Sequence, residues 1–203
     1  LRIRKKVLSE MHPDTAESLN NLAGVLEDQG KYYDAELLYR KGLFICEQIV
    51  GKVHPSTAAL INNLAFVLKS QSQYEEAEQL YRQSVDISEK VVGETHLNTA
   101  KALNNLAMIL VRQGKPNEVE CLYRRALKIK QQLFDENNPE IAFSMNNLAN
   151  FLKMQGEDHE AIWLYEQAYE KCRVSIGENH PDTQLYLKNW QHLLQEMNGA
   201  LGK

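Results

Sequence analysis

The sequence predicts an all-α fold built from stacked helical hairpins. Residues 19–23 read Leu-Asn-Asn-Leu-Ala, and versions of this segment return every 42 residues along the chain. Within a copy, apolar residues follow the i, i+3, i+4 and i+7 spacing that is typical of one buried helix face. Because a single hairpin cannot bury its apolar face alone, repetition at a fixed interval predicts a stack in which neighbouring hairpins complete the core.

The paired asparagines are the clearest marker of this repeat. The four full copies and a frayed fifth copy at residues 187–191 keep the same register, so they predict a surface made by stacking. The copies carry Asn20 and Asn21, Asn62 and Asn63, Asn104 and Asn105, Asn146 and Asn147, and finally Lys188 and Asn189.

Each repeat is predicted to contain a helix A and a helix B. Helix A begins at Pro13, a residue that suits the first helical turn, and Gly30 ends it because glycine adopts a left-handed backbone most readily. Helix B is expected from about Tyr33 to Val50, and Gly51 ends it. The unit begins at the His-Pro pair of His12 and Pro13. Counterparts of this histidine begin most of the following units.

This register divides the chain. We expect four repeats at residues 12–53, 54–95, 96–137 and 138–179, followed by a C-terminal capping helix at 180–203. Residues 1–11 match the end of a second helix, so we interpret them as the end of a preceding repeat and the chain as a piece of a longer protein.

Composition excludes several classes of protein. The chain has 203 residues, 43% apolar and 25% charged, as expected of a soluble globular chain, and no apolar run is long enough for a membrane span. A net charge of −4 argues against a general nucleic-acid binder. Three widely spaced cysteines, Cys46, Cys121 and Cys172, match no metal or disulfide pattern, which favours a reducing compartment and a cytoplasmic location.

The signature positions of the repeat resemble a known family. They match the tetratricopeptide repeat, and the 42-residue unit with its His-Pro, Leu-Asn-Asn-Leu-Ala and Gly-Lys-Tyr segments resembles the kinesin light chain type. The residues that carry this resemblance in the first unit are Leu22, Ala23, Gly30, Tyr32, Ala35 and Tyr39. Departures also occur: Ser72 replaces the glycine of the turn, and Asn138 replaces the histidine.

The resemblance implies a right-handed superhelical solenoid of stacked helix-turn-helix tetratricopeptide repeats, in which helix A lines a concave groove. Helical angles predict that Asn20 and Asn21 lean away from the core, toward opposite flanks of that groove. Beside them, the same register predicts a groove with basic and apolar character. Its further residues are Phe66, Lys69, Lys101, Met108, Arg112, Phe143, Asn150, Lys153, Met154 and Lys188.

These side chains predict a peptide-binding function. An amide both donates and accepts hydrogen bonds, so the asparagines can hold an extended peptide backbone. Lysine and arginine then select acidic residues, while phenylalanine and methionine receive an apolar anchor. The kinesin light chain resemblance implies the same class of ligand. We expect a protein or peptide partner, with no nucleic acid, membrane or cofactor.

The sequence also allows structural roles for these residues. The asparagines can instead bridge adjacent helices, the apolar residues can wedge between A helices, and the lysines can form an ordinary solvated face. The repeating histidines lie in successive loops, so helix-start contacts are favoured over a shared metal ion. No phosphate loop, nucleophile elbow or acid–base pair appears in the sequence, so we predict a non-catalytic protein. A self-associating or sensor arm of a larger protein is the alternative function.

Overall fold

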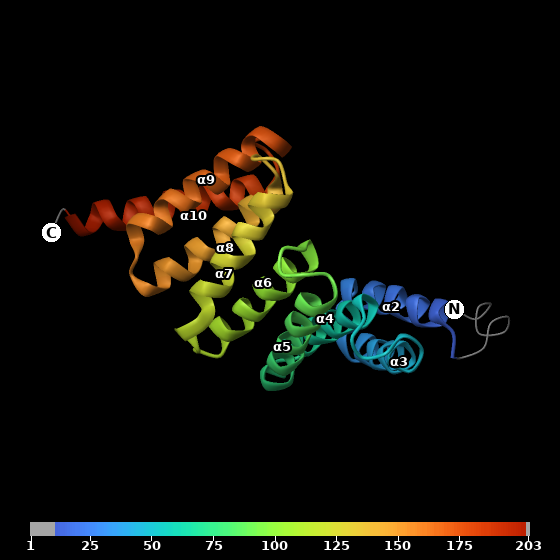
Figure 1. Ribbon diagram of the computed structural model, residues 1–203. Helices are drawn as coiled ribbons and strands as arrows, with labels where there is room; N and C mark the ends of the chain where they lie inside the picture. The colour runs from blue at the N-terminus through green and yellow to red at the C-terminus, as the bar shows by residue number, and fades with distance from the viewer. Residues whose placement is uncertain (1–10, 202–203) are drawn as a thin grey trace. The chain divides into compact units, whose positions relative to one another are not determined.

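The computed structural model describes residues 11–201, with side chains to residue 199. The secondary-structure elements of these residues are all helices, which turns connect (Figure 1). The predicted all-α fold of helix-turn-helix repeats is confirmed. The prediction for residues 1–11 falls almost entirely outside the described residues. The elements are α2 Pro13–Asp28, α3 Tyr32–Val50, α4 Pro55–Ser70, α5 Tyr74–Val91, α6 Leu97–Arg112, the short 3-10 helix η1 Pro116–Glu118, α7 Val119–Leu133, α8 Pro139–Gln155, α9 Asp158–Ile176 and α10 Pro181–Leu201.

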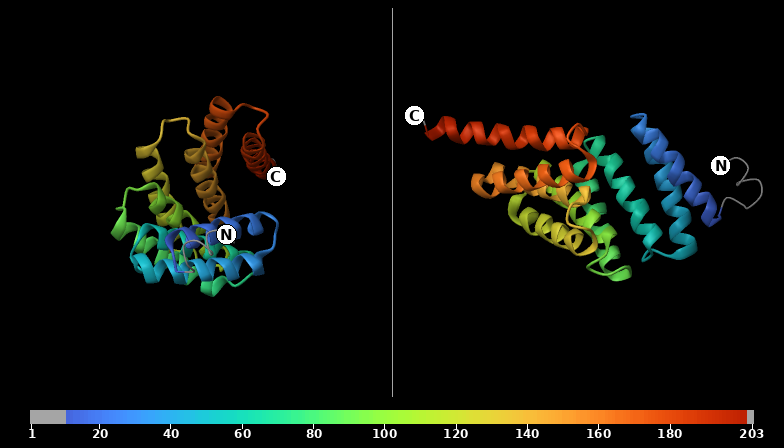
Figure 2. Two further views of the ribbon diagram at one scale, coloured as in Figure 1. Left: turned by 90° about the vertical axis from the view of Figure 1, so that its right-hand side faces the viewer. Right: turned by 90° about the horizontal axis from the view of Figure 1, so that it is seen from above.

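The chain forms two compact units with a boundary between Gly114 and Lys115. Unit 1 contains α2 to α6, and unit 2 contains η1 and α7 to α10. Within each unit, every α-helix packs against the next one in the sequence, which gives side-by-side helices of alternating direction (Figures 1 and 2). Nothing in either unit is a strand among the residues that the structure describes.

Histidine side chains cap the starts of the first helices of the repeats. The Nδ1 atom of His12 accepts a hydrogen bond from the backbone N–H of Asp14 at 3.2 Å, and the same contact recurs at His54, His96 and His180. Asn138 makes it through its Oδ1 atom, at 2.9 Å from the N–H of Glu140. Each contact satisfies one backbone donor that the helix itself leaves open. The predicted helix-start role of the histidines is confirmed.

The turn between the two helices of a repeat requires a left-handed residue. Gly30 and Gly156 occupy it with φ values of 72° and 83°. Ser72 occupies the equivalent position in the second repeat with φ of 64°. Among the described residues other than glycine, it alone has a positive φ. A side chain in this conformation carries a steric cost that glycine avoids.

The core follows the predicted stripes, with one exception. Ala23, Ala35 and Tyr39 are buried, as are the equivalents of Leu22 in later repeats. Leu22 itself is 39% exposed, whereas Leu64 is 1% exposed, so its predicted burial is wrong. The reason is positional, because α4 packs against the preceding α3 and no described helix precedes α2.

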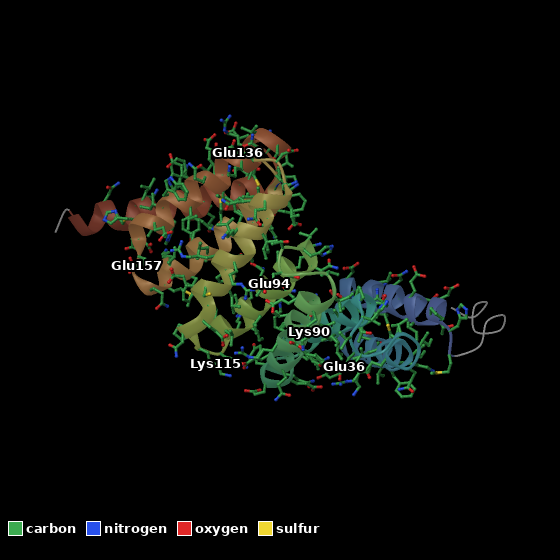
Figure 3. All side chains as sticks on the ribbon, in the orientation of Figure 1. Glu36, Lys90, Glu94, Lys115, Glu136 and Glu157 are labelled. Atoms are coloured by element: carbon green, nitrogen blue, oxygen red, sulfur yellow. The ribbon has the colours of Figure 1, made fainter. Side chains whose placement is uncertain are left out.

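Charged side chains occur on the helices and in the turns of both units. Glu36 and Lys90 belong to unit 1, and Glu136 and Glu157 belong to unit 2 (Figure 3). Across the described part of the chain, every helix is too short or too polar to cross a membrane.

Candidate functional site

The asparagine pairs of unit 1 connect consecutive first helices. The amide nitrogen of Asn63 on α4 donates to Oδ1 of Asn20 on α2 at 3.0 Å. Likewise, Asn105 on α6 donates to Oδ1 of Asn62 on α4 at 2.9 Å. The second asparagine of one repeat therefore bonds the first asparagine of the repeat before it. Each amide has further donor or acceptor capacity, since a primary amide carries two N–H groups and two lone pairs.

The same connection occurs in unit 2. The amide nitrogen of Asn189 on α10 donates to Oδ1 of Asn146 on α8 at 2.8 Å. Asn146 is buried, as is Asn104 on α6, whose amide contacts the sulfur of Met108 at 3.5 Å. Helical angles alone predicted side chains that lean away from the core. The difference arises because angles within one helix do not include the neighbouring helix that covers Asn146.

The second asparagine of the pair is exposed in the first repeat and half-buried in the later repeats. Asn21 is exposed and lies 3.5 Å from the amide of Asn20, whereas Asn63, Asn105 and Asn147 are half-buried. The bridging interpretation therefore describes the contacts of the ladder within each unit.

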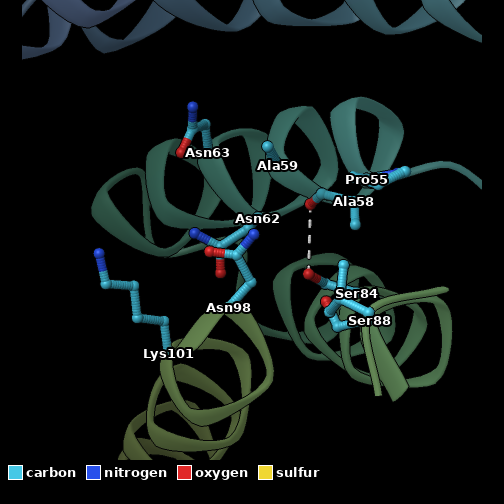
Figure 4. Close-up of a pocket in the computed structure, with 10 residues that line it drawn as sticks. Pro55, Ala58, Ala59, Asn62, Asn63, Ser84, Ser88, Asn98 and Lys101 are labelled. Atoms are coloured by element: carbon cyan, nitrogen blue, oxygen red, sulfur yellow. Dashed lines mark hydrogen bonds between the residues drawn. The ribbon is translucent and has the colours of Figure 1, made fainter. Parts of the chain in front are cut away.

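A pocket of about 180 Å³ lies beside this ladder in unit 1 (Figure 4). It occupies the space between the second helix α5 and the start of the next first helix α6, and we call this kind of space the inter-repeat notch. Ser84 and Ser88 form one wall, and the Ser84 hydroxyl donates to the carbonyl of Ala58 at 3.2 Å. Asn62 and Lys101 reach the pocket from the first helices. The notch thus offers amide, hydroxyl and ammonium groups.

An equivalent notch lies one repeat earlier, between α3 and α4. It has a volume of about 240 Å³ and is more apolar, because Cys46 takes the register position of Ser88 and Ile49 and Leu60 also line it. Glu17 supplies a carboxylate there. The two notches of unit 1 therefore have the same position and different chemistry: one contains the Glu17 carboxylate, and the other contains the Lys101 ammonium with amide and hydroxyl groups.

Three cations on the first helices of unit 1 lack an ion-pair partner within the described residues: Lys69, Lys101 and Arg112. Lys69 instead lies with its ammonium 4.3 Å from the centroid of the Phe66 ring. Burial lowers the pKa of Lys69, and Arg112 lowers it further by charge repulsion. By contrast, five cations on second helices lie 2.6 to 3.0 Å from carboxylate oxygens; these are Arg40, Arg82, Lys90, Arg124 and Arg173.

In unit 2, a buried lysine occupies the inter-repeat notch between α7 and α8. Lys130 is 1% exposed, and its ammonium lies 2.7 Å from the Glu140 carboxylate and 3.2 Å from the Glu140 carbonyl oxygen. Its nitrogen also lies 5.3 Å from the centroid of the Phe143 ring. Phe143, predicted as a ligand anchor, is 42% exposed and therefore both supports Lys130 and faces solvent.

Other predicted residues of unit 2 are engaged within the unit. The Tyr165 hydroxyl donates to Oδ1 of Asn150 at 2.7 Å. Lys153 forms an ion pair with Glu196 at 2.6 Å and lies 3.3 Å from the ring nitrogen of His192. The described side chains of Lys188 and Met154 are exposed.

Sequence reasoning missed several residues at these positions. Lys130, Ser88 and Asn98 were not selected, although Lys130 and Ser88 share one register position with Cys46 and Cys172. Comparing residue sizes at that position would have found them. Cys46 and Cys172 are buried as expected, but Cys121 is exposed. Among the described residues, no group of histidine, cysteine and carboxylate side chains has a metal-binding arrangement.

Comparisons with known proteins agree with this architecture. Two family models described as tetratricopeptide repeat match residues 56–132, and residues 15–56 and 143–182. The crystal structure of BtubC (BKLC) from P. vanneervenii is similar, with a TM-score of 0.82 and 24% identity over 97% of this chain and 78% of that one. Nearly identical TPR-like repeats assigned to a kinesin light chain of Podosopora anserina give 0.80 and 23%, over 93% and 89%. A comparison with curated protein sequences gave no match.

Proposed function

We propose that this chain, which belongs to the tetratricopeptide repeat family, is a non-catalytic module that binds short extended peptides across its first helices. Repeats of this family indicate protein partners in general. The finer proposal concerns the ligand: a segment in which acidic residues surround an apolar anchor, as in a cargo-adaptor-like scaffold.

One observation carries this proposal: among the described residues, no carboxylate forms an ion pair with the cations on the first helices of unit 1. Second-helix cations such as Arg40 and Arg124 have carboxylates at 2.8 Å, while Lys69, Lys101 and Arg112 have none. In a chain with net charge −4, a local excess of positive charge attracts acidic ligands and raises association rates. Phe66 and Met108, both half-buried, add apolar surface for an anchor.

The polar groups of the notch support an extended ligand. Asn62, Asn63 and Lys101 line the same pocket, and the amides retain capacity beyond the ladder (Figure 4). A peptide backbone has one donor and one acceptor per residue, so amides spaced by repeats match it. The three free cysteines agree with a reducing compartment, and we propose that the module acts in the cytoplasm.

Charge reversal tests the proposal. Lys101→Glu combined with Arg112→Glu is expected to weaken binding of acidic peptides bearing one Trp or Leu by about a hundredfold, roughly tenfold per charge. The matched control, Lys90→Glu with Lys128→Glu, makes the same change in net charge on second helices and is expected to leave affinity within about twofold. Fluorescence anisotropy against a peptide panel measures both. Equal binding by the two double variants would contradict the proposal.

A second candidate function rests on the outer surface of α3. Tyr33, Leu37 and Phe44 are 75%, 68% and 58% exposed, and their spacing places them along one side of the helix. An apolar stripe of this kind fits a structural or self-association role in a larger protein. Light scattering decides between the two: oligomers that persist in the Lys101 and Arg112 double variant and dissociate in Leu37→Glu favour association.

A further inference from the structure

A separate pocket lies at the other end of the first helices of unit 1, where α4 ends and α5 begins. It has a volume of about 330 Å³, roughly ten times the volume that a water molecule occupies in the liquid. Its lining is mostly polar. The residues are Tyr32, Lys69, Ser70, Ser72, Tyr74, Met108 and Arg112.

The charge in this pocket is positive. Lys69 from α4 and Arg112 from α6 line it together and repel one another. The acidic group that acts on Lys69 is Glu27, whose carboxylate instead accepts a hydrogen bond from the Tyr39 hydroxyl at 3.0 Å. Burial raises the pKa of Glu27, and the Tyr39 hydroxyl and Lys69 act in the opposite direction. An anion in the pocket would relieve the repulsion between the two cations.

Hydroxyl groups surround the two cations. Ser70 donates to the carbonyl of Phe66 at 3.0 Å, and the Tyr74 hydroxyl donates to Ser72 at 3.5 Å, which leaves the Ser72 proton available. The Tyr32 hydroxyl has no hydrogen-bond partner within residues 11–199. The hydroxyl protons of Ser72 and Tyr32 therefore remain available beside the two cations. A phosphate monoester has three acceptor oxygens and about −1.5 to −2 charges, whereas a carboxylate has two oxygens and one charge.

The residues of this pocket come from three consecutive repeats, and other repeats carry different residues at its charged positions. One repeat earlier, Glu27 and Asp28 occupy the register positions of Lys69 and Ser70, which reverses the charge. Met154 occupies the register position of Arg112 one repeat later. The repeat accommodates acidic and apolar residues at these positions, so packing does not require the cations.

We propose that this pocket binds the phosphate group of a phosphorylated serine or threonine carried by the bound peptide. The proposal rests on the proposed peptide-binding function, because the phosphate arrives on a peptide. Both pockets are lined by α4 and α6. Lys101 and Arg112 lie eleven residues apart on α6, which is about 16 Å along the helix. An extended peptide covers this distance in about five residues.

The test uses a peptide library with a fixed central serine between randomised acidic and apolar positions. The library is made in three forms, with serine, phosphoserine or glutamate at the fixed position. We expect the phosphoserine form to be retained about tenfold more strongly than the serine form, and the glutamate form to gain about threefold or less. Selected phosphopeptides should carry an acidic residue about five positions from the phosphoserine.

Variants assign the effect to the pocket. Lys69→Glu and Arg112→Met introduce residues that other repeats carry at these positions, and each should abolish the preference for phosphoserine. Lys90→Met on the outer side of α5 should keep the preference. Lys101→Met should weaken all three forms equally, because Lys101 lies in the other pocket. Circular dichroism melting of each variant confirms folding.

The outcomes separate this inference from the proposed function. Retention of the serine and glutamate forms without any gain from phosphorylation would overturn the phosphate site and leave the peptide-binding function intact. Retention of none of the three forms would overturn both. Inorganic phosphate provides the remaining arm: competition at concentrations as low as those of the phosphopeptides would overturn the assignment of a peptide source.

Discussion

The inter-repeat notches of the two units occupy the same register position and contain different residues. In unit 1, the small Ser88 leaves a pocket of about 180 Å³ that Asn98 and Lys101 also line. In unit 2, Lys130 takes the position of Ser88, and its carboxylate partner Glu140 takes the position of Asn98. One long side chain therefore fills, with an ion pair, the position that is an open pocket in unit 1. A repeat scaffold can thus open or close a site without changing its backbone pattern.

The largest expected effect comes from breaking the ion pair of unit 2. Glu140→Gln leaves the buried Lys130 ammonium without its carboxylate, which typically costs about 3–5 kcal/mol for a buried pair. We expect about 2–3 kcal/mol, because the Glu140 side chain is 45% exposed and its carbonyl still accepts at 3.2 Å. Urea unfolding followed by circular dichroism measures the loss.

Two controls define this prediction. Glu120→Gln breaks an exposed pair with Arg124 on the same helix and should cost less than about 1 kcal/mol. Lys130→Met combined with Glu140→Gln removes both charges and should restore stability to within about 1 kcal/mol of the parent. If Glu140→Gln costs no more than Glu120→Gln, Lys130 gains its stability from groups other than this carboxylate.

The second prediction transfers the ion pair to unit 1. Ser88→Lys places an ammonium where Ser88 is 4% exposed, and without a carboxylate it should cost about 2 kcal/mol. Adding Asn98→Glu should recover at least about 1 kcal/mol and reduce acidic-peptide affinity by about tenfold, because the lysine fills the pocket beside Lys101. Gln83→Lys, on the exposed side of α5, is the matched control for added charge.

An unchanged peptide affinity in the stable double variant would show that ligands do not enter the notch of unit 1. That result would shift the proposed binding surface toward the Lys69 and Arg112 pocket, which Ser88 does not line. Stability and peptide affinity, measured on the same variants, therefore separate the energetic difference between the notches from their difference in accessibility to a ligand.

This comparison also shows what sequence reasoning can reach. Periodicity predicted the helices and the caps, because Pro13, Gly30 and the repeating histidines act within one or two turns of chain. The Asn63 to Asn20 hydrogen bond was only one of two open alternatives. Deciding its geometry requires the offset between neighbouring helices, which angles within a single helix do not contain.

The pocket of Lys69 and Arg112 was out of reach for a related reason. Both cations were predicted as groove residues. Their neighbours Tyr32 and Tyr74 begin second helices; Tyr32 was interpreted only as a repeat marker, and Tyr74 was not singled out. Lys130 appeared as a polar residue at a position where other repeats carry cysteine or serine. Its role depends on burial by α8, and burial of a charge is visible only once the helices are packed.

The smallest expected effect compares the turns of the two units. Gly156 adopts its left-handed conformation in unit 2 without steric cost, whereas Ser72 adopts it in unit 1 with φ of 64°. Ser72→Gly should therefore relieve strain and stabilise the protein by about 0.5–1 kcal/mol, and Gly156→Ser should destabilise it by a similar amount. Thermal unfolding of the two variants measures the opposite shifts.

Strain that persists at one turn of four requires a reason, and the Ser72 hydroxyl in the positive pocket supplies one. Ser72→Gly should then stabilise the fold while reducing phosphoserine preference by about threefold, through loss of one hydroxyl donor to the phosphate. Ser72→Ala separates the two effects, since it retains the strain and removes the hydroxyl. If Ser72→Gly gains stability and retains the full preference for phosphoserine, the serine is a tolerated defect of the turn and its hydroxyl does not contact the ligand.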